Sequence, residues 1–266
     1  MGTEKMTKPS GIGLIYKIPA ILFLVFMGYY TVMMLLAPAG TLKKMEDEYG
    51  FSQDENNTAD ERILTDSAYL ELLKEKGFLQ SRIAMAETDS IYLTADLTDS
   101  IVSLEISGVE VHTADIRKMK ISRILKYGND YIVSTMLSRP LNIVREYSSI
   151  QKEPLMIKMA PRDTSEYVPD IIPDTADYEP VNFILEMDNG IVISVYQEEK
   201  LNQGDAMNLF GFDLRYRIKN SIRSLGSVFT LKVPEYHPFI KLRLAREDAK
   251  IIYRALPRQG QIAVCL

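Results

Sequence analysis

The chain has 266 residues, 46% of them hydrophobic and 25% charged, so it can bury one sizeable core beside a small appendage. Its 36 acidic residues outnumber its 31 basic residues, which argues against broad binding of nucleic acid, since that needs clustered Lys and Arg. One Cys, two His and the lack of a Walker A or Gly-x-Gly-x-x-Gly motif give no basis for a disulfide, a metal site or a nucleotide cofactor.

The first predicted element is a membrane-spanning helix. Residues 18–37 form a run of twenty residues without a charge, and a helix of that length spans roughly 30 Å, the thickness of the hydrocarbon core of a bilayer. Three Lys precede the run and two follow it, which favours cytoplasmic residues 1–17 and an extracytoplasmic C-terminal domain. These are Lys5, Lys8 and Lys17, then Lys43 and Lys44. We therefore predict a single-pass protein of the cell (inner) membrane.

Two other interpretations of the apolar run stay open. A cleaved signal peptide is compatible with the small residues of Ala37-Pro38-Ala39, although the run is longer than the usual 7–15 residues of a signal h-region. A buried helix of a soluble domain is the second, but nothing polar interrupts the run as it would on a surface helix. The length of the run favours a retained anchor.

Residues 38–80 are predicted to form a juxtamembrane linker and a helix. Residues 38–58 are polar and acidic, as expected of a linker. Thr58 can cap a helix over residues 59–76, and Gly77 is the expected stop.

The remaining residues, 81–266, are predicted to form a β-rich domain. Period-two alternation predicts three strands, over residues 91–97, 101–106 and 109–116. Residues 181–187 and 191–196 read as a hairpin with Asn189-Gly190 as a type I′ turn. Further predictions are a strand at 155–159, a long Pro-containing loop at 160–180, a helix at 205–225 ended by Gly226, and a strand at 228–233.

The tail of the chain carries the most specific pattern. His237-Pro238-Phe239-Ile240-Lys241-Leu242 is followed by a predicted helix over residues 247–257, a turn at 258–260 and an apolar strand at 261–266. This order resembles the end of the L,D-transpeptidase catalytic domain, where the signature reads His-Gly-Cys-Ile-Arg-Leu and the helix begins near an Asp-Ala pair. Asp96-Leu97 and Gly108-Val109-Glu110-Val111 resemble the first strands of the same family. The resemblance implies a β-sandwich or meander with a few helices.

The resemblance also implies that the chemistry of the family is lost. In that family a Cys thiolate attacks a peptide carbonyl and a nearby His takes its proton. Phe239 occupies the position of the Cys, Pro238 that of the Gly and Lys241 that of the Arg, and no His lies between His112 and His237. We therefore predict no catalytic residues, and a remnant site of His237, Phe239 and Lys241.

Two other sets of residues have weaker functional interpretations. Cys265 is expected to be a small buried residue of the last strand, since no His flanks it. The basic residues of the helix at 205–225 are expected to form a solvated face, with an anionic lipid headgroup or glycan as the alternative. They are Arg215, Arg217, Lys219 and Arg223.

The sequence thus predicts a non-catalytic, membrane-anchored protein of the cell envelope that binds peptidoglycan peptide or a protein partner. Two alternatives stay open. One is a peptidoglycan transpeptidase-type enzyme with an unrecognised nucleophile. The other is a structural anchor subunit of an envelope complex, in which the helix at 59–76 makes the contacts and the resemblance arises by chance.

Overall fold

The structure, a computed structural model, describes residues 11–50, 66–152, 180–199 and 203–266. The chain divides into two compact units, which we describe separately. The smaller unit combines Met1–Lys43 with Arg217–Tyr236, and the larger one, the sheet unit, combines Lys44–Tyr216 with His237–Leu266. The predicted strand at 155–159 and nearly all of the predicted loop at 160–180 lie outside the described residues.

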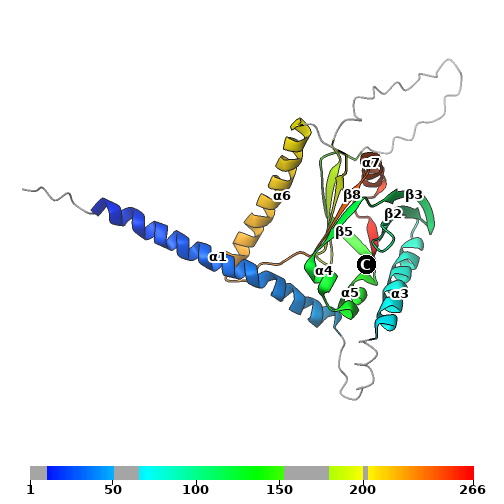
Figure 1. Cartoon of the computed structure of the whole chain (residues 1–266), viewed down its shortest axis with the longest axis horizontal. Coiled ribbons are helices and arrows are strands. Elements are labelled where there is room, and N and C mark those ends of the chain that lie inside the picture. Colours follow the sequence, from blue (N-terminus) through cyan, green and yellow to red (C-terminus); the bar gives the residue numbers. More distant parts are fainter. Residues whose placement is uncertain (1–10, 51–65, 153–179, 200–202) are drawn as a thin grey trace, which may run out of the picture. The chain divides into compact units, whose positions relative to one another are not determined.

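Within the described ranges, nine strands form one mixed sheet (Figure 1). Its order from edge to edge is β3-β2-β1-β9-β5-β6-β7-β8-β4. The pairs β1–β9 and β7–β8 are parallel, and the other neighbours are antiparallel. The strands are β1 (Ile91–Asp96), β2 (Ile101–Ile106), β3 (Val109–Asp115), β4 (Lys118–Ile121), β5 (Leu141–Ser148), β6 (Asn182–Met187), β7 (Val192–Gln197), β8 (Phe239–Leu244) and β9 (Gln261–Cys265).

Helices pack on this sheet and connect its strands. The helix α3 begins after Asp66, whose side chain caps it by accepting a hydrogen bond from the Ala68 amide at 3.0 Å. It packs on α5 and β9, where Met85, Tyr92 and Ala263 form a buried cluster. The helices are α1 (Gly11–Tyr49), α3 (Ser67–Ala86), α4 (Arg123–Tyr127), α5 (Asp130–Leu137), α6 (Gln203–Phe229) and α7 (Arg246–Ala255).

The middle of the sheet is buried on both faces. Strands β1, β6, β7 and β9 have runs of consecutive buried residues, whereas β3, at an edge, is mostly exposed. On one face α7 packs against β7, and the ring of Tyr253 lies 5.1 Å from that of Phe183. The last strand in the sequence, β9, therefore lies in the interior of the sheet, between β1 and β5.

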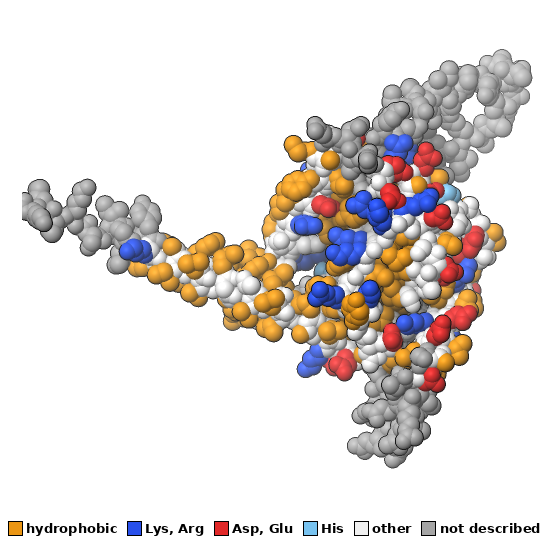
Figure 2. Space-filling view, in the orientation of Figure 1, with side chains coloured by type: hydrophobic (Ala, Val, Ile, Leu, Met, Phe, Trp, Pro, Cys, Tyr) orange, Lys and Arg blue, Asp and Glu red, His pale blue; other side chains and the backbone are white. Residues whose placement is uncertain are grey.

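The smaller unit contains the apolar N-terminal helix. Residues 17–49 of α1 include a stretch long and apolar enough to cross a membrane, and only 6% of its most apolar window is buried. Figure 2 shows apolar side chains along most of this helix. The predicted N-terminal apolar helix is thus confirmed by its length and composition, which a signal sequence would share.

Several predicted boundaries are wrong, and at Gly77 the reason is packing against a residue distant in the sequence. Residues 38–49 continue α1 through Pro38 instead of forming a linker, and Met45 in this stretch is buried. Gly77 lies inside α3 and does not end it. A Cβ at this position would come within 3.0 Å of the Ser138 Cβ, so the glycine permits close packing of the helix. Similarly, α6 continues past Gly226 to Phe229, and residues 228–233 do not form a strand. Residues 59–65 lie outside the described ranges.

The prediction of a β-rich domain with a few helices is confirmed, and most strand predictions with it, but the described strands form one mixed sheet and not the β-sandwich that the resemblance implies. The structure has the predicted first three strands, the hairpin β6–β7 and the succession β8–α7–β9. The hairpin turn is not type I′, which needs positive φ at two central residues, because Gly190 has a φ of +83° and Asn189 has no positive φ.

Candidate functional site

The three predicted remnant-site residues lie together at the start of β8. His237 precedes the strand, and its Nδ1 lies 3.2 Å from the carbonyl oxygen of Gly190 in the β6–β7 turn. Because a carbonyl can only accept, Nδ1 carries the proton of this hydrogen bond. Phe239 and Lys241 share one face of β8, and the Lys241 Nζ lies 5.6 Å from the centre of the Phe239 ring.

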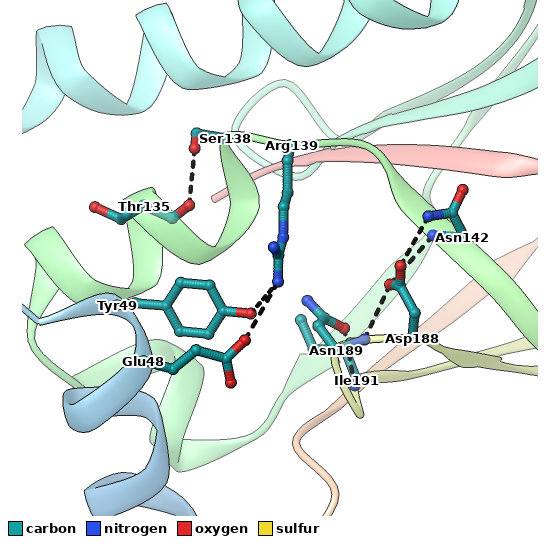
Figure 3. A network of polar contacts seen from close by, with 9 residues as sticks. All are labelled: Glu48, Tyr49, Thr135, Ser138, Arg139, Asn142, Asp188, Asn189 and Ile191. Atoms are coloured by element: carbon teal, nitrogen blue, oxygen red, sulfur yellow. Dashed lines mark hydrogen bonds and ion pairs between the residues drawn. The ribbon is translucent and has the colours of Figure 1, made fainter.

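Side-chain hydrogen bonds hold the turn beside His237 (Figure 3). Asp188 accepts from the Asn142 side chain at 2.8 Å and from the Asn189 amide at 2.9 Å. Asn189 in turn accepts from the Ile191 amide at 3.1 Å. The position of Gly190, and hence of the His237 ring, is therefore fixed by β5 as well as by the hairpin itself.

The same view contains the contact between the last turn of α1 and the loop before β5. Arg139 donates to the Tyr49 hydroxyl, and its Nη2 lies 3.4 Å from Glu48 Oε1 (Figure 3). Burial, together with the hydrogen bond to Glu48, raises the pKa of Tyr49 to about 12. These contacts tie the last turn of α1 to the loop before β5 within the sheet unit.

Replacing Gly190 by Ala is expected to lower the free energy of unfolding by about 1–2 kcal/mol, the cost of a side chain in the left-handed region. The new Cβ would lie 3.6 Å from His237 Nδ1, an ordinary contact, so backbone strain is the cause of the loss. Urea unfolding of the full chain in detergent measures it. The control is Gly211→Ala, with open space around it within α6, which should raise stability by up to about 1 kcal/mol. Equal effects of the two variants would contradict this account.

Basic side chains gather on the outer strands next to this site. In the β4–β8 ladder Lys118 is paired with Arg243 and Lys120 with Lys241, so all four side chains share one face of the sheet. Lys118 also forms an ion pair with Glu198 at 3.0 Å. Figure 2 shows Lys and Arg side chains gathered where Figure 1 places β8 and α4. The segment from Ile116 to Asn129 adds to this charge, since it contains no acidic residue.

A cavity of about 280 Å³ opens between these strands and the N-terminal half of α6. Tyr196 of β7 forms part of its wall and donates a hydrogen bond from its hydroxyl to Asp213 of α6 at 3.0 Å. The Lys241 ammonium lies 5.8 Å from the centre of the Tyr196 ring. The polar lining consists of Lys118, Lys120, Tyr196, Asp213, Lys241 and Arg243, and the apolar lining of Met119, Leu209 and Leu242. Four cations against one carboxylate make this cavity suitable for an anionic ligand.

Among the described residues, no Cys, Ser or Thr side chain lines this cavity. Cys265 lies on β9, and three strands separate it from β8 in the sheet. Burial raises the pKa of the Cys265 thiol, and the Asp96 carboxylate raises it further, which is the opposite of an activated thiolate. Among the described residues there is also no cluster of three His, Cys, Asp or Glu side chains that could hold a metal ion.

Comparison with models of known families, with curated proteins and with solved structures finds no match. The function must therefore be argued from the residues themselves. The sequence singled out Lys241 but missed Lys118, Lys120 and Tyr196. Two short sequences, Lys-Met-Lys and Lys-Leu-Arg, could have indicated these residues. In a strand, basic residues at i and i+2 lie on the same face of the sheet.

Proposed function

We propose that the chain is a membrane-anchored, non-catalytic protein of the cell envelope whose sheet unit binds a peptide rich in carboxylates, with peptidoglycan stem peptide as the candidate. The observation that carries this proposal is the cationic cavity beside Phe239. Arg243 and three Lys can bind carboxylates, and Tyr196 and Leu209 supply a surface for the rest of a peptide. In this proposal the sheet unit descends from an L,D-transpeptidase domain and has lost its activity. It faces away from the cytoplasm.

Calorimetric titration of the full chain in detergent with a disaccharide-tetrapeptide tests the proposal. We expect saturable binding, weakened about tenfold or more by Arg243→Met, because hydrogen bonds to charged groups contribute about 1.5–3 kcal/mol. Lys76→Met is the matched control, since it removes one charge from α3 and does not line the cavity. It should leave the affinity unchanged.

Two outcomes would contradict the proposal. Absence of measurable binding would remove the peptidoglycan ligand. A covalent adduct with a carbapenem-type probe would show that the protein is acylated. It would favour an enzyme whose nucleophile lies at a position other than Phe239. Loss of that adduct in Cys265→Ser would then identify the nucleophile.

A further inference from the structure

The end of α6 and the segment after it expose apolar side chains in a basic setting. We call residues 217–236 the α6 tail; the whole of it belongs to the smaller unit. Ile218, Ile222 and Phe229 follow helical spacing and are exposed, and Leu231 beyond the helix is 77% exposed. No Asp or Glu occurs between Asp213 and Glu235. The basic residues of the tail are Arg217, Lys219, Arg223 and Lys232.

At the end of α6, Leu231 adopts a left-handed backbone conformation that is energetically unfavourable for a leucine. The Lys232 amide donates to the Ser227 carbonyl and the Leu231 amide to the Val228 carbonyl, both at 3.0 Å, which is the Schellman pattern. The residue in the left-handed position of this pattern is usually Gly, but here it is Leu231, with a φ of +57°. A side chain at that φ costs about 1–2 kcal/mol. In water an exposed leucine would give nothing in return.

The same pattern leaves the helix end suited to lipid. A backbone amide or carbonyl without a partner is strongly unfavourable in hydrocarbon, so a segment that enters lipid must pair these groups internally. At this helix end, the Ser227 carbonyl accepts from Lys232 and also from the Thr230 hydroxyl, the latter at 2.9 Å. The Gly226 carbonyl accepts from the Thr230 amide at 3.3 Å.

Residues of the α6 tail from Phe229 to Tyr236 contact the apolar helix α1 within the smaller unit. The rings of Phe229 and Phe26 are stacked with their centres 5.2 Å apart, and Phe26 lies within the uncharged run of residues 18–37. At the other end of the tail, the Thr41 hydroxyl donates to the Tyr236 carbonyl at 2.9 Å. If α1 lies in a bilayer, its partner Phe229 and the neighbouring Leu231 are brought to the same bilayer.

We propose that the α6 tail inserts Phe229 and Leu231 into the bilayer beside α1 while its basic residues contact anionic headgroups. The chain would thus contact the membrane at two points far apart in the sequence. The inference rests on the proposed anchoring by α1. A basic amphipathic helix with exposed apolar side chains is the form that interfacial membrane segments take. Pairing of two copies through this face is disfavoured, because an isologous contact would bring the cations of both tails together.

Site-specific fluorescence in vesicles tests the inference with the full chain. In a Cys265→Ser background, a single Cys is introduced at Leu231, at Leu24 in α1 or at Val109 in β3, all exposed positions, and labelled with an environment-sensitive dye. The protein is reconstituted in phosphatidylcholine vesicles that contain phosphatidylglycerol. We expect the labels at Leu231 and Leu24 to be quenched by lipids with a nitroxide on the acyl chain and to lose quenching by aqueous iodide. The label at Val109 should show the reverse.

The three labels separate the ways in which the inference can fail. Iodide quenching at Leu24 would refute the anchor and with it the proposed membrane attachment. A shielded Leu24 label beside a Leu231 label as open to iodide as Val109 would refute the α6 tail insertion alone. Shielding at Leu231 that appears only at high protein-to-lipid ratio, without quenching by the nitroxide lipids, would assign this face to a second copy of the chain and overturn the proposal.

Discussion

Replacing Arg82 by Met is expected to lower the free energy of unfolding by about 3 kcal/mol, because it leaves a buried carboxylate without its counter-ion. Glu105 on β2 is 1% exposed, and its Oε1 lies 2.8 Å from Arg82 Nη2. The second oxygen accepts from Arg82 Nε at 3.3 Å, and the Thr94 hydroxyl donates to Oε1 at 2.8 Å. The loss should lie at the lower end of the range for buried pairs, since the Arg82 side chain is 31% exposed. Chemical denaturation of the full chain in detergent measures it.

Two further variants separate the buried charge from other consequences of removing Arg82. Adding Glu105→Gln to Arg82→Met should recover part of the stability, because the uncompensated charge is then gone. Arg139→Met breaks the exposed contacts with Glu48 and with the Tyr49 hydroxyl and should cost about 1 kcal/mol or less. An Arg82 variant no less stable than the Arg139 variant would mean that α3 is held to the sheet by apolar packing alone.

Local patterns predicted the fold wherever neighbours in sequence are also neighbours in space. The meander β1–β2–β3 and the hairpin β6–β7 follow from period-two alternation and glycine-containing turns. The predictions at Gly77 and Gly226 failed because each glycine was taken as a helix stop from local propensity. At Gly77 the deciding fact is the close approach of Ser138, which lies some sixty residues away in the chain. A prediction from neighbouring residues in the sequence cannot include this contact.

The candidate site was predicted in part for the same reason. His237, Phe239 and Lys241 belong to one short stretch with an identifiable pattern. Lys120 lies beside Lys241 only because β4 pairs with β8, which brings together residues far apart in the sequence. The composition gave no hint of it, because the net charge of −5 conceals a basic face on an acidic protein.

The position of β9 gives the tail of the chain a structural role that does not depend on the chemistry of Phe239. Ile262 is fully buried and is paired with Leu93 of β1 on one side and with Leu141 of β5 on the other. No other strand joins β3-β2-β1 to β5-β6-β7-β8-β4 within the described residues. The tail is thus needed for folding whatever happens at Phe239.

Ending the chain after Gly260 is therefore expected to leave the sheet unit unfolded, because the edges of β1 and β5 lose their ladders and the buried face of β9 is lost with them. Rapid proteolysis and loss of near-ultraviolet circular dichroism report this outcome. A graded version is Ile262→Ala, which should cost about 2–5 kcal/mol, against the partly exposed Gln261→Ala, which should cost far less. Removal of Leu266 alone, outside β9, is the control for shortening. A folded, protease-resistant chain ending at Gly260 would mean that β1 and β5 can pair directly, and that the tail is dispensable for the fold.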